Sequence, residues 1–357
     1  MISDKRNRIQ IDNPREELKY LIEKNYAKAV QYENGFFEVN SSIANRLNII
    51  NSRSFSPYFG AAENADLEFP NFFAVIEDAA VLGYSYHLLD VQNNVTINSK
   101  LFDFSWNGRF ATSIPTEPIP VLEGDALLAC SANSGSHYHT IAEYLAKLIV
   151  CVDANQTRFD YIFVHGLQKE IDLLRMLQFK GKLVKLADFF YKPFICERLF
   201  VPSSYQPNIF IKTGIVKKIN KLFTERNTTL PGRNKILILR RQTRRFSNEE
   251  DLRNFLTNYG FSALYLEDYS LEDTLNIFNA AEVVIGFHGA GLTNIIFSKK
   301  VVVIEITSND HSLLFSGLAA QLRFNHYFYV AEFNTETNTV DLDLAELKDA
   351  LKSINVI

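Results

Sequence analysis

The sequence predicts an α/β protein in which two Rossmann-like halves follow one another along the chain. Apolar runs of strand length alternate with segments whose apolar residues recur at helical spacing, and this alternation predicts parallel sheets. At 357 residues the chain is long enough for two domains of ordinary size. In the second half, a glycine-rich segment directly follows an apolar run, which is where such sheets usually bind a ligand.

Breaks in the periodic pattern near Val201–Pro207 and Pro231–Asn234 divide the chain, because proline and polar clusters interrupt regular structure there. We expect a helix at the end of the chain that is able to pack back on the first domain. The expected segments are an N-terminal α/β domain over 1–205, a linker with a bridging helix over 206–232, a Rossmann-like domain over 233–335, and the C-terminal helix within 336–357.

The expected elements follow the alternation of apolar runs and helical spacing. In the first half we predict strands over 72–76, 79–82, 126–130 and 161–164, with a helix over 138–150. In the second half we predict strands over 235–239, 263–266, 301–306 and 326–330 and one that begins at Val283, and helices over 209–223, 249–259, 270–280, 311–322 and 342–354.

Composition excludes several classes of protein. A formal net charge of −4 argues against a general nucleic-acid binder. The three cysteines are scattered without a Cys-x-x-Cys spacing, which fits a reducing compartment and predicts neither a disulfide framework nor a zinc site. No apolar run approaches the roughly 20 residues of a membrane span. These features predict a cytoplasmic protein and leave peripheral association with the inner face of the cell membrane open.

The segment from Gly286 to Asn294 is the strongest functional signal in the chain. An apolar run ends there, three glycines surround a histidine, and a helix is expected to follow, ending near Phe297. Glycines let a backbone approach a phosphate closely, and a helix N-terminus favours an anion. We therefore expect this segment to bind the phosphates of a ligand, through His288, Gly289, Ala290, Gly291 and Asn294.

Charged residues at the ends of two other predicted strands extend this site. Arg240 follows one strand, with Arg244 and Arg245 close behind, and guanidinium groups bind phosphate oxygens in bidentate fashion. Glu305 lies near the end of another strand, where a carboxylate is able to hold a ribose hydroxyl. The simpler interpretations are a solvated basic turn for the arginines and a turn cap for Glu305.

A second group of candidate residues lies at the start of the helix in the first half. His139 and Glu143 are one helical turn apart, and either is able to act as general base toward a hydroxyl. The alternative is a structural i,i+4 pair. We expect no metal, because His137 and His139 diverge on a helix and no third ligand is near. Asp341-Leu342-Asp343 is better explained as a helix N-cap than as a metal motif.

These segments together resemble the family 61 glycosyltransferases. Gly286–Asn294 matches the family's Gly-x-His-Gly-Ala-Gly-Leu-Thr-Asn element, and Leu239–Arg245 is similar to its Ser-Arg-x-x-Ala-Arg-Arg element. Val303–Ile306 resembles its Val-x-Glu-Ile, while Tyr138, His139 and Glu143 resemble its aromatic-His-Trp-x-x-Glu helix. Thr140 departs from the usual tryptophan, and Lys299-Lys300 from a usual Pro-Gly turn.

The resemblance implies a GT-B-like fold, with two Rossmann-like domains facing each other across a cleft. It implies an inverting transferase that moves a sugar from a nucleotide sugar, with a UDP-sugar favoured, to a glycan hydroxyl, without a cofactor or a metal. The absence of an apolar N-terminal anchor favours a bacterial enzyme of capsule or lipopolysaccharide assembly. A nucleotide-sugar epimerase and a non-catalytic nucleotide-sugar-binding protein remain as alternatives. A hydrolase is disfavoured, since no Gly-x-Ser-x-Gly element follows the histidine segment.

Overall fold

The computed structural model divides the chain into two compact units, and we describe each by itself. Unit 1 comprises residues 1–33 and 67–206, and unit 2 comprises 34–66 and 207–357. The structure describes residues 9–11, 19–20, 23–24, 27–30, 48–51, 71–82, 87–91, 95–97, 119–130, 136–186, 194–203, 213–225, 234–308 and 313–357. The breaks that we predicted near 201–207 and 231–234 lie largely outside these ranges.

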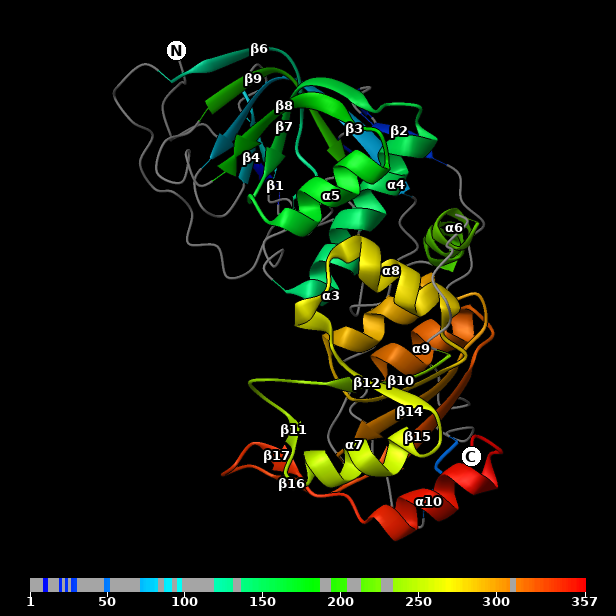
Figure 1. Cartoon of the computed structure of the whole chain (residues 1–357). Helices are drawn as coiled ribbons and strands as arrows, with labels where there is room; N and C mark the ends of the chain where they lie inside the picture. Colours follow the sequence, from blue (N-terminus) through cyan, green and yellow to red (C-terminus); the bar gives the residue numbers. More distant parts are fainter. Residues whose placement is uncertain are drawn as a thin grey trace. The chain divides into compact units, whose positions relative to one another are not determined.

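Unit 2 is built on a five-stranded sheet that is parallel throughout, with strand order β12-β10-β13-β14-β15 (Figure 1). The chain leaves β10 to form β12 on one side and then returns to form β13 on the other side. This order makes a doubly wound sheet with its topological switch point between β10 and β13. The strands are β10 (Lys235–Leu239), β12 (Phe261–Tyr265), β13 (Val283–Phe287), β14 (Val302–Thr307) and β15 (Asn325–Val330).

Alternate residues of these strands face opposite layers of helices, as the two-residue period of a strand requires. Leu237, Ile285 and Ile304 lie in one hydrophobic core with helices α7 (Glu249–Thr257) and α10 (Leu344–Ser353). Figure 1 shows these two helices on one face of the sheet and α8 and α9 on the other. The other helices are α6 (Thr213–Thr224), η6 (Leu266–Asp268), α8 (Leu271–Ala280), η7 (Ala290–Phe297) and α9 (Leu314–Gln321).

Two expectations about the domain boundaries need correction. Helix α10 packs in the core of unit 2, because its Leu347, Ala350 and Leu351 are buried among the residues of that sheet. We had expected it to be able to pack on the first domain. Residues 34–66, which we had placed in the N-terminal domain, belong to unit 2. Their described part, Asn48–Asn51, pairs with the outer edge of β15, since the Phe328 amide donates to the Asn48 carbonyl at 2.8 Å.

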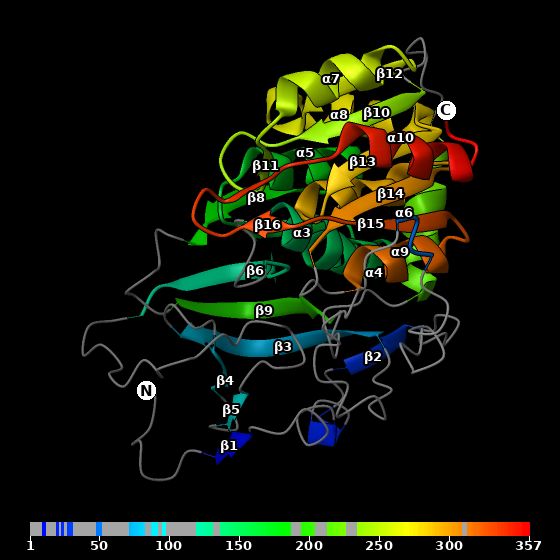
Figure 2. The ribbon, with the colours of Figure 1, turned by 90° about the horizontal axis from the view of Figure 1, so that it is seen from below.

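Unit 1 contains a nine-stranded mixed sheet with the order β1-β5-β4-β3-β9-β6-β7-β8, and β2 also pairs with β3 (Figure 2). Strands β9, β6, β7 and β8 are parallel, whereas β3 is antiparallel to β9. The strands are β1 (Ile9–Ile11), β2 (Ala27–Val30), β3 (Asn71–Leu82), β4 (His87–Asp90), β5 (Val95–Ile97), β6 (Val121–Leu127), β7 (Arg158–Val164), β8 (Lys180–Lys185) and β9 (Phe194–Pro202).

The expectation of a Rossmann-like first half is therefore correct for one part of this sheet and wrong for the rest. The order β8-β7-β6-β9 is that of a Rossmann half, with helices connecting β6 to β7 and β7 to β8. The two strands that we predicted over 72–76 and 79–82 are one strand, β3. Asp78 interrupts its apolar pattern with a left-handed φ of 48° but does not end the pairing with β9.

The helix between β6 and β7 changes its winding along its length. It consists of α3 (His137–His139), a π-helical turn η3 (Thr140–Tyr144) and α4 (Leu145–Asp153). Leu145 donates its amide to the carbonyl of Thr140, five residues earlier, so the turn holds one more residue than an α-helix. Helix α5 (Gln168–Met176) follows β7. π-turns are frequent at functional sites.

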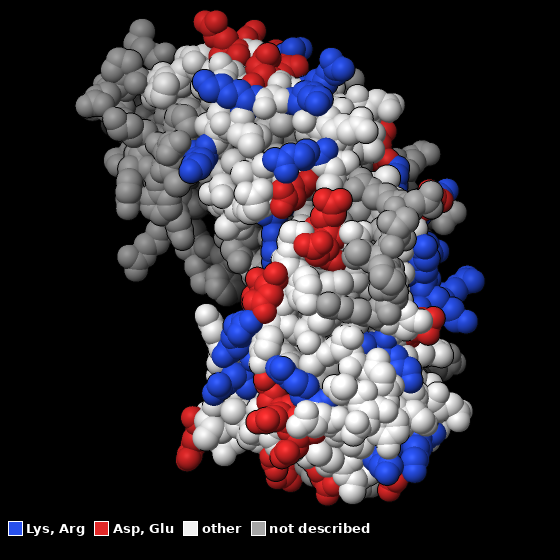
Figure 3. Space-filling model, in the orientation of Figure 1, with Lys and Arg blue, Asp and Glu red and all other residues white. Residues whose placement is uncertain are grey.

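Unit 2 also contains a second, smaller sheet. Short strands β11 (Arg245–Phe246), β16 (Phe333–Asn334) and β17 (Thr339–Val340) form a three-stranded sheet in unit 2. On the face shown in Figure 3, acidic and basic side chains are interspersed over the coloured residues. Among the described residues, no helix combines the length and apolar character needed to cross a bilayer.

Candidate active site

The carboxyl ends of β10 and β13 flank the topological switch point of unit 2. Arg240 directly follows β10, and His288 directly follows β13. The two strands are hydrogen-bonded neighbours, with Ile238 opposite Gly286, so the two segments leave the sheet side by side. Ligands of doubly wound sheets bind at this position, outside the carboxyl ends of the strands. The structure thus brings together the arginine segment and the glycine-histidine segment that the sequence singled out.

Two arginine side chains converge on the backbone of the glycine-histidine segment. Arg244 Nη1 donates to the carbonyl of His288 at 3.0 Å, and Arg240 Nη1 reaches the same carbonyl at 3.5 Å. Among the described residues, no carboxylate lies within 4.0 Å of either guanidinium. Burial, followed by the neighbouring charge of Arg244, lowers the pKa of Arg240. Two half-buried cations without a carboxylate between them favour the binding of an anion.

The other two arginines of this segment point elsewhere. Arg241 is exposed, pairs with Asp268 at 2.5 Å and lies over the ring of Tyr265 at 4.1 Å. Arg244 adopts a left-handed φ of 56°, which redirects the chain into β11, where Arg245 is exposed. Arg245, which we expected to bind the donor, therefore makes none of the contacts with the His288 carbonyl that Arg240 and Arg244 make.

Gly289 lies directly against the guanidinium of Arg240. A Cβ atom at this position would lie 2.3 Å from Nη1 of Arg240, so any side chain here displaces that guanidinium. The helix that we expected after the glycines is the 3₁₀-helix η7, which begins at Ala290. The buried amide of Asn294 donates to the carbonyl of Gly291 at 2.9 Å and holds the turn. Asn294 thus supports the loop from within.

Replacing Gly289 with alanine is expected to weaken binding of an anionic ligand at this site by about 10- to 100-fold, the size of one lost charged hydrogen bond. The new methyl group meets the flexible end of Arg240 and no backbone atom, so the melting temperature should change little. Calorimetric titration with a nucleoside diphosphate measures the effect. In an Arg240→Ala background the same substitution should have little further effect. A full additional loss there would contradict this explanation.

His288, Glu305 and His326 form a buried chain of hydrogen bonds. Nδ1 of His288 contacts one carboxylate oxygen of Glu305, and Nε2 of His326 lies 2.8 Å from the other. Glu305 is completely buried, and the ring of His288 packs against Phe315 at 5.1 Å between centroids. The position does not suit the direct ribose contact that we expected for Glu305, because both of its oxygens already face imidazoles. Glu305 is placed to orient His288.

The carboxyl group of Glu305 is held in its ionised form. Burial alone would raise its pKa, but the hydrogen bonds from His288 and His326 and their charges outweigh burial and lower the pKa from 4.5 to about 2. A carboxylate that stays ionised keeps Nδ1 of His288 as a donor, so the ring has one orientation.

This lowered pKa predicts an acid-sensitive contribution to stability. The folded pKa lies below the ordinary value, so the contribution is present above about pH 4.5 and is lost as the pH falls toward 2. The shift corresponds to a contribution on the order of 3 kcal/mol. Urea unfolding followed by circular dichroism should show this loss in the wild type. Glu305→Gln should be less stable at pH 6 and lose less on acidification, whereas the exposed Glu282→Gln should follow the wild type.

In unit 1, His139 and Glu143 form the pair that we expected. Nδ1 of His139 contacts a carboxylate oxygen of Glu143, and the π-turn η3 begins directly after His139 and contains Glu143. The side chain of Glu143 is 8% exposed and that of His139 is 25% exposed. Nε2 of His139 has no hydrogen-bond partner among the described residues. The geometry therefore presents His139 outward and keeps Glu143 behind it as the residue that orients the ring.

The Asp341-x-Asp343 motif has the structural role that we expected. Asp343 is the N-cap of α10 and accepts from the amides of Ala345 and Glu346 at 2.8 and 3.1 Å. Asp341 accepts from the hydroxyl of Ser247 at 2.7 Å. Both carboxylates thus stabilise local structure in unit 2.

Sequence reasoning missed two groups of residues. His326 was assigned only to a strand, since nothing in the sequence connects it with Glu305, 21 positions away. Cys130, His165 and Glu170 cluster in unit 1, and their ligand atoms lie within 4.8 Å of one another. His165 directly follows β7 and precedes Gly166, which is the same pattern of strand, histidine and glycine that identified His288. This shared pattern could have identified His165 as a candidate site residue from the sequence.

A doubly wound sheet with a cationic, glycine-rich switch point defines unit 2 as a Rossmann-type unit equipped to bind an anionic ligand. Residues 137–304 match the family model described as Glycosyltransferase 61. This match supports a glycosyltransferase of family 61. The match begins two residues before His139 and ends one residue before Glu305, so it includes both Arg240 and His288. No curated protein matches the chain.

Proposed function

We propose that the enzyme transfers a sugar from a nucleoside diphosphate sugar, with a UDP-sugar favoured, to a hydroxyl group of a glycan, with inversion at the anomeric carbon. The observation that carries this proposal is the convergence of Arg240 and Arg244 at the switch point of unit 2, without a carboxylate partner. The proposal includes the GT-B arrangement, with the donor bound by unit 2 and the acceptor by unit 1. It also includes a role in capsule or lipopolysaccharide assembly at the cytoplasmic side of the membrane.

On the donor side, the diphosphate would bind Arg240, Arg244 and the backbone amides of Gly289, Ala290 and Gly291. His288, oriented by Glu305, would supply a further polar contact to the same group. These groups are in place before the reaction begins, so they stabilise the charge that develops on the leaving diphosphate. Because the cations come from the protein, the proposal requires no divalent ion at the diphosphate.

On the acceptor side, His139 would remove the proton of the attacking hydroxyl through Nε2. The oxygen forms a bond to the anomeric carbon, and the bond from that carbon to the diphosphate oxygen breaks. The electron pair of the broken bond leaves with the diphosphate, and the proton remains on His139. Glu143 compensates the positive charge that the ring then carries. One displacement of this kind inverts the anomeric configuration.

The test is an assay of the purified enzyme with a panel of nucleotide sugars and glycan acceptors, in buffer without added Mg²⁺ or Mn²⁺. We expect release of one nucleoside diphosphate for each glycosidic bond, and NMR of the product should show inversion. Transfer with retained configuration would contradict the single displacement. Turnover that depends on added Mg²⁺ would contradict the role given to the arginines. Conversion of the donor without an acceptor would instead indicate an epimerase.

A further inference from the structure

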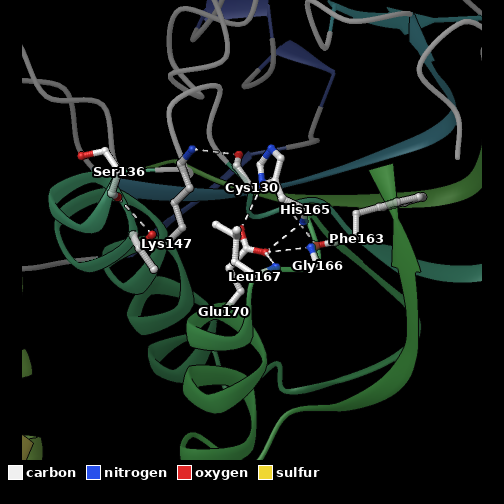
Figure 4. Close-up of polar contacts among 9 residues, drawn as sticks. Cys130, Ser136, Lys147, Phe163, His165, Gly166, Leu167 and Glu170 are labelled. Carbon is white, nitrogen blue, oxygen red and sulfur yellow. Dashed lines mark hydrogen bonds and ion pairs between the residues drawn. The ribbon is translucent and has the colours of Figure 1, made fainter. Parts of the chain in front are cut away.

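A buried polar cluster in unit 1 lies at the carboxyl ends of two adjacent parallel strands. Cys130 follows β6, His165 follows β7, and Glu170 lies in the first turn of α5. Figure 4 shows the three side chains next to one another, above the start of that helix. None of them takes part in the donor site or in the pair formed by His139 and Glu143. The proposed function therefore leaves this cluster without a role.

The three side chains offer one sulfur, one nitrogen and one oxygen ligand at close range. Each of these ligand atoms lies within 4.8 Å of the others. Cys130 and Glu170 are completely buried, while the side chain of His165 is 22% exposed and gives access from solvent. Two ligands of one zinc ion lie roughly 3–4 Å apart at its usual bond lengths, so small side-chain adjustments bring the atoms to that spacing.

The protein holds this cluster rigidly from several sides. One oxygen of Glu170 accepts from the backbone amides of His165, Gly166 and Leu167 at 2.9–3.3 Å. The other oxygen lies 2.9 Å from Nδ1 of His165. Thus one carboxylate fixes both the loop and the imidazole, so Glu170 and His165 are held in one arrangement.

Two further observations mark the cluster as more than a helix cap. The hydroxyl of Tyr144 is buried next to it, its pKa is raised by burial and by the charges of Cys130 and Glu170, and it has no hydrogen-bond partner among the described residues. The buried ammonium of Lys147 donates to the Cys130 carbonyl at 3.3 Å. A buried hydroxyl without a partner is costly, so an additional polar group beside it would be favourable.

We propose that Cys130, His165 and Glu170 form a binding site for a divalent cation of the zinc class, which stabilises unit 1. A thiolate, an imidazole and a carboxylate are a ligand set that zinc accepts, and the fourth position would hold a water molecule beside the Tyr144 hydroxyl. On binding, the metal–sulfur bond replaces the S–H bond of Cys130, and the proton is released to solvent. At present that thiol donates to the carbonyl of Phe163 at 3.0 Å.

The test uses Co²⁺ as a spectroscopic probe on the protein of residues 1–357 after treatment with a chelator. We expect one equivalent of Co²⁺ to produce a near-ultraviolet thiolate-to-cobalt charge-transfer band, which Zn²⁺ then removes by displacement. Cys130→Ser should abolish the band, and His165→Asn should weaken Co²⁺ binding by about 10- to 100-fold. Circular dichroism of each variant establishes that it is folded.

Cys151→Ser is the matched control, because Cys151 is an equally buried free cysteine in the same unit. It should leave the band and its stoichiometry unchanged. A wild-type protein that shows no thiolate band, or a Cys130→Ser variant that retains one, overturns the proposal. If the Cys130→Ser variant does not fold, the His165→Asn variant is the test. An unchanged affinity of His165→Asn for Co²⁺ would also overturn the proposal. None of these outcomes bears on the donor site.

Discussion

Replacing both Arg240 and Arg244 with alanine is expected to weaken binding of a nucleoside diphosphate by about 10²- to 10⁴-fold. A hydrogen bond to a charged group contributes about 1.5–3 kcal/mol, and the variant removes two such donors from a half-buried position. Water would take the place of the two guanidinium groups at the carbonyl of His288, so the fold should persist. Isothermal titration calorimetry gives the dissociation constant, and thermal unfolding reports the stability of the variant.

Arg241→Ala provides the matched control, because it removes a neighbouring arginine that faces away from the site. Its guanidinium is exposed, pairs with Asp268 and lies over Tyr265. Exposed ion pairs contribute little, so the dissociation constant should stay within about threefold of the wild-type value. Equal losses in Arg241→Ala and in the double variant would indicate a general effect of positive charge and would exclude a specific diphosphate site.

Substitution of His139 is expected to lower kcat by about 10²- to 10⁴-fold while leaving the dissociation constant of the donor unchanged. His139→Gln keeps a polar side chain of similar length but cannot accept a proton near neutral pH. Glu143→Gln should lower kcat by a smaller factor, because the ring keeps its position but loses the carboxylate that compensates its charge. Steady-state kinetics and donor titration separate the two effects.

Asp172→Asn is the control for this pair, since it removes a carboxylate from an i,i+3 ion pair in unit 1. It should leave kcat within about twofold of the wild-type value. Which of the two variants, His139→Gln or Glu143→Gln, loses more of its kcat identifies the base. If Glu143→Gln loses far more activity than His139→Gln, then the glutamate is the base and the histidine orients it.

Much of unit 2 could be predicted from the sequence, because its apolar runs and helix signals are local. Ser270 caps α8 as the sequence indicates, and its hydroxyl accepts from the amide of Asp273 at 3.0 Å. Strand β10 has the predicted limits. In unit 1, the edge strand β8 was missed, since its Lys-Gly-Lys-Leu-Val-Lys sequence has no apolar alternation. A charged edge strand protects a sheet from pairing with other molecules.

The candidate site shows the same division between local and distant determinants. The approach of Arg240 to His288 follows from strand order, which the alternation of strands and helices predicts. The pairing of Glu305 with two histidines could not be predicted from its own strand. One of these histidines, His326, comes from the adjacent strand β15. Likewise, a left-handed φ at Arg244 separates Arg245 from the site, and no turn residue such as glycine marks that position in the sequence.

The pairing of Asn48–Asn51 with β15 affects how the protein reaches its native state during synthesis. Asn48 donates its side-chain amide to the carbonyl of His326, 278 positions later, at 3.1 Å. This contact therefore forms only after the residues up to His326 have been synthesised, and such distant contacts slow folding. A fragment that begins at residue 207 would lack this segment and expose the edge of β15, so it should aggregate when expressed alone. Supplying residues 34–66 in trans should restore its solubility.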